Sequence, residues 1–264
     1  MRRFFLVLPA GLLAALVSTG CLRSTTTIDL RADGSGTIVQ ETAMTAQALA
    51  MLKNFASQSN SGGAPPTDLF TEEQAKKAAD SMGVTFVSGE PFKTADFEGY
   101  RARYSFDDIS KIKVSMDQSM SSAQTGGTSK QPPFAFGFDK GAASSTLTIQ
   151  MPEQTPANQL PGLQSNATTE AEKAQAAQAL GMMKMMMKGL FVDVSMNVGG
   201  KVIKTNAPHV DGSRVTLLQI DFDKLLADEA ALQKLQAASD LKSLASVPGL
   251  KISSEPKLTV EFAR

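Results

Sequence analysis

Alternation of apolar and polar residues recurs along most of the chain, and it limits the possible folds more than any other feature of the sequence. In segment 190–198 every second residue is Leu, Val or Met, and most of the residues between them are polar. Segments 100–106, 134–138 and 257–262 alternate in the same way. A strand with one buried and one exposed face has this pattern, which is common in antiparallel sheets. The sequence therefore predicts a mostly antiparallel sheet of short strands.

Turn sequences between these segments predict hairpins. Asp33-Gly34-Ser35-Gly36 separates the β-prone segments 25–31 and 37–42, and Asp211-Gly212-Ser213 precedes the segment 214–222. Gly takes the positive φ that a tight turn requires. An Asp-Gly-Ser loop could instead hold calcium, but the further carboxylates of an EF-hand loop are missing. The hairpin is therefore the favoured interpretation.

Helical patterns are found in segments 45–57, 71–82, 169–188 and 223–235. The third of these begins with Thr and Glu at capping-box spacing and continues in a run rich in Ala, Gln and Met. Flexible loops, rich in Ser, Gly, Gln and Pro, are expected near 57–67, 117–133 and 152–168. Strands grouped as hairpins favour an α+β fold: a mostly antiparallel sheet of short strands and hairpins with about four packed helices.

The N-terminus has the pattern of an export signal. Two Arg residues precede an apolar run over residues 4–17, and Ser18-Thr19-Gly20 leads to Cys21. The run is too short to span a bilayer, so residues 1–20 are expected to be a signal peptide. The end of the run resembles the bacterial lipobox, whose Cys receives a diacylglyceryl group and becomes the first residue. Residues 21–264 would then form a lipid-anchored exported domain; the alternative is an ordinary signal followed by a free thiol.

Charge gives the exported domain little attraction to anionic surfaces. The chain has 26 Lys plus Arg and 26 Asp plus Glu, and removal of residues 1–20 takes away two Arg and no acid, which leaves 24 against 26, or −2. This balance argues against a nucleic-acid partner and against electrostatic membrane binding. Membrane attachment would depend on palmitate-type acyl chains on Cys21. By similarity to the lipoprotein sorting rule, Leu22 after the Cys favours the periplasmic face of the outer membrane.

Few residues in the chain are suited to catalysis or metal binding. One Cys and one His cannot build a disulfide framework, a thiolate zinc site or a multi-histidine metal site. His209 is interpreted as a loop residue, and the carboxylate pairs Asp107-Asp108 and Asp221-Asp223 as helix caps. We therefore expect no catalytic residue, no metal and no cofactor.

Three runs of residues carry a family resemblance. The run from Gly199 to Asn206, the following Asp211-Gly212-Ser213-Arg214-Val215-Thr216 and the early Asp33-Gly34-Ser35-Gly36 resemble the LppM-type domain of bacterial envelope lipoproteins. What this resemblance implies is an α+β domain anchored at the envelope, which could include a groove for lipid. It implies no catalytic residue.

Methionine is unusually concentrated in segment 182–187, where five of six residues are Met. On a helix these side chains would cover more than a core stripe. Three interpretations remain open: adaptable core packing, a deformable wall for a lipid or apolar partner, and a soft copper(I) site. The second, together with the aromatic face of strand 134–138, gives the candidate ligand-binding residues Met182, Met183, Met186, Met187, Phe134, Phe136 and Phe138.

The functional hypothesis that follows is a membrane-anchored, non-enzymatic lipoprotein that binds a lipid or envelope protein through the Met-rich helix and a sheet face. The alternative is a structural or assembly lipoprotein without a ligand. Copper binding or an unrecognised hydrolase comes third.

Overall fold

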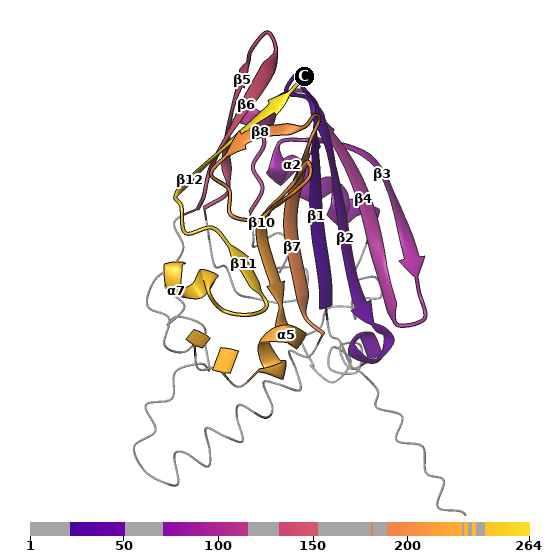
Figure 1. Ribbon diagram of the computed structural model, residues 1–264. Helices are drawn as coiled ribbons and strands as arrows, with labels where there is room; N and C mark the ends of the chain where they lie inside the picture. Colours follow the sequence, from indigo (N-terminus) through magenta and orange to yellow (C-terminus); the bar gives the residue numbers. More distant parts are fainter. Residues whose placement is uncertain are drawn as a thin grey trace, which may run out of the picture.

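Two β-sheets dominate the computed structural model (Figure 1). It describes residues 22–50, 71–115, 132–152, 181, 189–228, 230–231, 234–235 and 241–264. The larger sheet has the strand order β11-β10-β7-β1-β2-β4-β3, with β9 paired to β10, and the smaller has the order β5-β6-β12-β8. The prediction of a mostly antiparallel α+β fold with about four helices is confirmed.

The bounds of the elements are as follows. The strands of the larger sheet are β1 (Leu22–Leu30), β2 (Gly36–Thr45), β3 (Thr85–Lys93), β4 (Phe97–Phe106), β7 (Phe191–Val198), β9 (Val210–Asp211), β10 (Arg214–Asp221) and β11 (Leu250–Ile252). Those of the smaller sheet are β5 (Ala135–Lys140), β6 (Ser144–Gln150), β8 (Val202–Thr205) and β12 (Lys257–Ala263). Helical elements are α2 (Glu72–Met82), α5 (Phe222–Ala227), α7 (Leu241–Ala245) and the 3-10 helix η1 (Ile109–Lys111).

Both predicted Asp-Gly-Ser turns are confirmed. Gly34 has φ 94° between β1 and β2, and Gly212 has φ 60° between β9 and β10. In the first turn the Asp33 carboxylate accepts hydrogen bonds from the Ser35 hydroxyl (2.7 Å) and backbone N–H (3.0 Å). These hydrogen bonds lower the pKa of Asp33, because they stabilise the charged carboxylate.

Strand β1 lies in the middle of the larger sheet. It pairs with β2 in antiparallel orientation and with β7 in parallel orientation, each along nearly its whole length. The β1–β7 pair joins segments more than 150 residues apart, because Leu22–Leu30 runs beside Phe191–Val198. Local alternation predicts both strands but carries no information on this pairing.

The helices are partly as predicted. Helix α2 begins with a complete capping box between Thr71 and Gln74 and ends at Gly83 in the left-handed conformation, in agreement with the predicted 71–82. The helix predicted over 223–235 is interrupted. Helix α5 ends at Ala227; Asp228 is extended and accepts a 2.8 Å hydrogen bond from Ala230 N–H, and residues 230–231 and 234–235 are helical again. Residue 181 is helical, and the rest of the predicted helix 169–188 lies outside the described residues, as does most of the predicted helix 45–57.

Some strand predictions also need correction. The expected short strand 84–87 continues as β3 to Lys93. Of the expected strand 112–116, the described residues 112–115 form only an isolated bridge, between Val114 and Phe134. Strand β11 and helix α7 have no counterpart among the predicted elements. The three expected loops lie almost entirely outside the described residues.

The main core lies between the sheets and under α2. It contains Ile28 and Ile38 from the larger sheet, Leu147 and Phe262 from the smaller sheet, and Met82 from α2, all nearly or completely buried. We call the face of the larger sheet that carries Ile28 the inner face and the opposite one the outer face. Alternation places Leu22, Ser24 and Thr26 of β1 on the inner face, and Arg23, Thr25 and Thr27 on the outer face.

Candidate functional site

The phenylalanines of the predicted ligand-binding face belong to the packed core. Phe134 and Phe136 are 1% and 7% exposed. Phe138 is half-buried and tilts against Phe262, with ring centroids 6.4 Å apart. In this conformation the first two rings contact the protein interior rather than an exposed wall. The four candidate methionines, Met182, Met183, Met186 and Met187, lie outside the described residues, and so does Cys21.

A different cluster lies at the end of the larger sheet where β1 begins. The guanidinium carbon of Arg23 is 5.8 Å from the ring centre of Phe97 on β4 and 5.1 Å from that of Phe191 on β7. Both distances are within the range of cation–π attraction. Arg23 is exposed and the two rings are half-buried. We call Arg23, Phe97 and Phe191 the Arg23 cluster.

The sheet register explains how one arginine reaches two rings. Arg23 is directly paired with Phe191 on one side and with Ala43 of β2 on the other. Ala43 is paired with Gly99, where an added Cβ would lie 2.6 Å from the Ala43 Cβ. Ala43 and Gly99 have no bulky side chains on the outer face. The guanidinium of Arg23 can therefore extend across β2 to Phe97 on β4.

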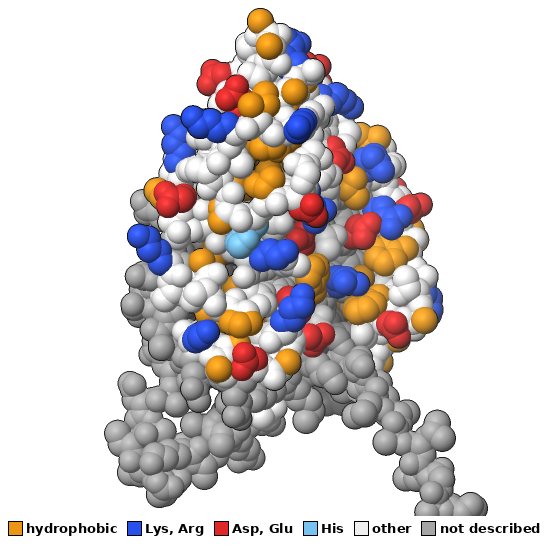
Figure 2. Space-filling model, viewed as in Figure 1, with side chains coloured by type: hydrophobic (Ala, Val, Ile, Leu, Met, Phe, Trp, Pro, Cys, Tyr) orange, Lys and Arg blue, Asp and Glu red, His pale blue; other side chains and the backbone are white. Residues whose placement is uncertain are grey.

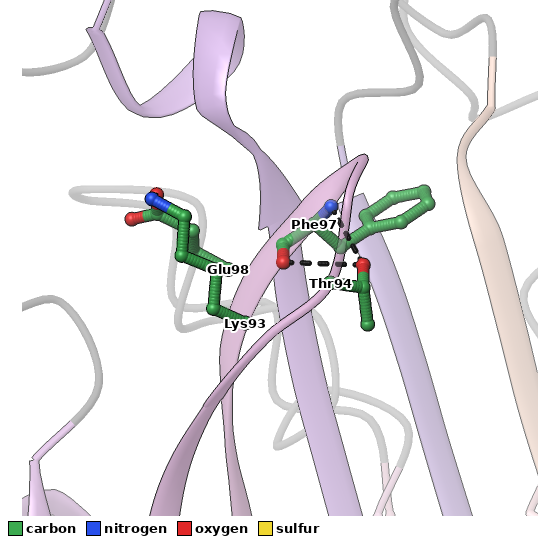
Figure 3. A network of polar contacts seen from close by, with 4 residues as sticks. All are labelled: Lys93, Thr94, Phe97 and Glu98. Carbon is green, nitrogen blue, oxygen red and sulfur yellow. Dashed lines mark hydrogen bonds and ion pairs between the residues drawn. The ribbon is translucent and has the colours of Figure 1, made fainter.

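The turn between β3 and β4 holds Phe97 in place (Figure 3). Thr94 N–H donates to the Phe97 carbonyl at 2.8 Å, and Phe97 N–H donates to Thr94 Oγ1 at 3.0 Å. Lys93 and Glu98 form an ion pair beside this turn. Figure 3 shows the Phe97 ring pointing away from that pair, as alternation along β4 requires.

Contacts to α5 hold Phe191. Gly189 N–H donates to the Asp223 carboxylate at 2.7 Å, and Phe222 N–H donates to the Leu190 carbonyl at 3.1 Å. Gly189 has φ 73°, a conformation that favours Gly and lets the chain turn into β7. The capping role predicted for Asp221 is confirmed, because its side chain accepts from Lys224 N–H at the start of α5.

Among the described residues, the guanidinium of Arg23 has no acidic partner. One row further along the outer face, Glu41 accepts from Arg101 Nε at 2.5 Å, and Asp193 accepts from Arg214 at 2.7 Å. Within the described part of the chain, no carboxylate forms an ion pair with Arg23. Over β2, β4 and β3, Figure 2 shows hydrophobic side chains interspersed with charged ones rather than one continuous apolar surface.

The inner face at the same end of the sheet has a small apolar cluster beside the Lys93–Glu98 ion pair. Leu22, Met44 and Leu49 form a small buried cluster separate from the main core, with Ala48 and Leu190 packed against it. Thr45 starts the short helical segment 46–50 by accepting from Ala48 N–H at 3.2 Å. The start of β1 is therefore held by apolar packing on one face and by the Arg23 cluster on the other.

Two further polar candidates are Asp108 and His209. Asp108 caps η1 by accepting from the Ser110 hydroxyl and N–H, and these hydrogen bonds lower the pKa of Asp108. His209 is half-buried; its Nε2 has no hydrogen-bond partner among the described residues, and its carbonyl accepts from Thr216 N–H. A search of the described residues finds no group of His, Cys, Asp or Glu that could hold a metal ion.

Comparisons with known proteins give one distant likeness. No protein-family model matches the chain, and no curated protein matches it. The chain is similar to the NMR structure of the folded domain of LppM from Mycobacterium tuberculosis, with 9% sequence identity and a TM-score of 0.35, over 93% of this chain and 91% of that chain. None of the described helices is long and apolar enough to cross a membrane.

Sequence patterns alone do not identify the Arg23 cluster. A signal is present, because Arg23 follows Cys21 by two residues and occupies a polar position in an alternating strand. The two rings that surround it are contributed by Phe97 and Phe191, which are distant in sequence and adjacent only through the order of the strands.

Proposed function

We propose that this protein is a lipoprotein of the bacterial cell envelope, without catalytic activity, held at the membrane by acyl chains on Cys21. The observation that carries the proposal is the position of β1. This strand begins at Leu22, immediately after Cys21, and lies in the middle of the larger sheet. An anchor on Cys21 would therefore act directly on the folded domain, without a flexible linker.

The energetics of such an anchor favour stable attachment. Each buried methylene of an acyl chain contributes about 0.8 kcal/mol, and two or more chains are enough for lasting attachment. The net charge of −2 after signal removal gives no comparable electrostatic term. The residue after Cys21 is Leu22, and by similarity to the lipoprotein sorting rule this residue favours the periplasmic face of the outer membrane, which is the proposed location.

A Cys21→Ala variant tests the anchor. We expect wild-type protein in the membrane fraction, with an N-terminal peptide whose mass includes acyl chains, and we expect the variant in the soluble fraction with no added mass. Ser24→Ala is the matched control, because it changes a small residue near the anchor and leaves the thiol in place. Membrane fractionation of Cys21→Ala indistinguishable from that of wild type would overturn the proposal. A density gradient that separates the inner and outer membranes tests the location.

We further propose that the domain binds a lipid or an apolar envelope partner through the Met-rich segment 182–187. Support for this part comes from the sequence: thioether side chains are polarizable and adapt to irregular apolar ligands. Copurifying lipid, measured by mass spectrometry of the intact protein released from membranes, tests it. Paired Met183→Lys and Met187→Lys substitutions should abolish copurification, whereas Lys184→Met should not. Equal lipid content in wild type and both variants would contradict the proposal.

A further inference from the structure

We propose that the Arg23 cluster binds phosphate groups of phospholipid headgroups and so fixes the orientation of the larger sheet on the membrane. This inference rests on the proposed anchor at Cys21. The anchor alone would let the domain turn freely about its acyl chains. The inference adds that the domain contacts the bilayer through the Arg23 cluster and so has one orientation.

Distance places Arg23 at headgroup level. Only Leu22 separates it from Cys21, and an extended chain advances roughly 3.3 Å per residue, so the Arg23 Cα lies about 7 Å beyond that of Cys21. The polar region of each leaflet is about 5–8 Å thick, since a bilayer of about 40–45 Å has a hydrocarbon core of about 30 Å. The length of an arginine side chain lets the guanidinium reach any depth within this layer.

The chemistry of the cluster suits a phosphate. A guanidinium has five N–H donors in a planar fork that matches two phosphate oxygens. The guanidinium carbon of Arg23 lies over the rings of Phe97 and Phe191, and its N–H groups donate to no described residue. Among the described residues no carboxylate neutralises the charge. Cation–π attraction also strengthens as water is removed, so the cluster would hold its geometry in the headgroup layer.

The surroundings of the cluster explain why it would set the orientation of the domain on the membrane, while attachment to the membrane would depend on the acyl chains. The exported domain has a net charge of −2, so the whole surface is not drawn to anionic lipid. On the inner face at this end, Leu22 and Met44 are buried against Leu49, and the charges of Lys93 and Glu98 offset each other in an ion pair. A single cation beside the anchor, on the outer face, would therefore set the tilt of the sheet.

Tryptophan fluorescence gives a direct test, because the chain contains no Trp. Phe97→Trp introduces one indole within the cluster and keeps an aromatic face under Arg23. Ile203→Trp is the control, because Ile203 is 58% exposed on β8, which follows the far end of β7. The full acylated protein is inserted into vesicles of phosphatidylethanolamine and phosphatidylglycerol that carry a nitroxide quencher on the headgroup. We expect the Phe97→Trp variant to lose most of its indole emission and the Ile203→Trp variant to keep it.

Arg23→Gln in the Phe97→Trp background tests the role of the guanidinium. Arg103→Gln is its matched control, because Arg103 is an exposed arginine of the same outer face, further from Cys21. We expect Arg23→Gln to restore most of the emission without changing acylation or thermal unfolding, and Arg103→Gln to leave the quenching unchanged. Quenching that survives Arg23→Gln would overturn this inference, and so would unquenched emission from a Phe97→Trp variant that is acylated and membrane-bound. Absence of acylation would instead refute the proposed anchor.

Discussion

Alkaline pH should destabilise the protein through one buried phenol. Tyr104 on β4 is 1% exposed, and its ring meets Phe86 edge-on at 6.1 Å. Burial raises the pKa of Tyr104 from 10.0 to about 12, with a smaller contribution from Tyr100. The tyrosinate is therefore disfavoured in the folded protein. The free energy of unfolding does not depend on this group well below about pH 10, which is the pKa that Tyr has in the unfolded chain, and it falls as the pH rises from about 10 to about 12. Linkage gives a loss of about 1.4 kcal/mol at about pH 11, approaching about 2.7 kcal/mol above about pH 12.

The assay compares urea unfolding of wild type and Tyr104→Phe at about pH 8 and about pH 11. Lysines titrate alike in both proteins, so the difference between the two pH dependences isolates Tyr104. At neutral pH the variant should differ little, because the hydroxyl makes only a long 3.4 Å hydrogen bond to Gln40. The chain has two tyrosines, so tyrosinate absorbance resolves the titration directly. Equal loss of stability in both proteins between these pH values would refute the reasoning.

Two further substitutions test the outer face and the first hairpin. Arg214→Ala should lower the free energy of unfolding in urea by about 1–2 kcal/mol, because it leaves the buried Asp193 carboxylate with only its Ser195 hydrogen bond. The 43% exposure of the Arg214 side chain limits this loss. An unchanged unfolding midpoint would contradict this prediction. Gly36→Ala should cost about 3 kcal/mol or more, since its Cβ would lie 2.1 Å from the Asp29 carbonyl oxygen. The control Gly137→Ala meets only Thr148 at 3.6 Å and should be close to neutral by the same measurement.

The sequence predicts those elements whose signals are local. Alternation identifies β7 because one face of the strand must be buried, and Asp33-Gly34 identifies the first hairpin because the turn needs a positive φ. The errors come from tertiary contacts. Apolar spacing over 223–235 continues past Asp228, yet that residue turns out of the helix and caps the next turn. The full length of β3 depends on pairing with β4, which its own residues do not encode.

The candidate site is less accessible to prediction than the fold. The aromatic face of Phe134, Phe136 and Phe138 suggests a ligand wall, but alternation alone does not distinguish a face packed against a second sheet from one that faces a ligand. The structure places the first two in the core. Recognition of the Arg23 cluster requires the strand order, since its rings come from strands on both sides of β1 and β2.

The position of β1 suits the proposed anchor on Cys21 mechanically. A membrane anchor transmits any force on the domain to the strand it is joined to, and an edge strand such as β3 or β11 could be peeled away by breaking one ladder of hydrogen bonds. Strand β1 is paired on both sides, with β2 and with β7, so its removal would break two ladders together. The parallel β1–β7 pair would therefore help to resist a pulling force on β1. It supplies the second ladder of hydrogen bonds to the strand that would be pulled by the proposed anchor. It also places Phe191 beside Arg23 at the N-terminal end of that strand.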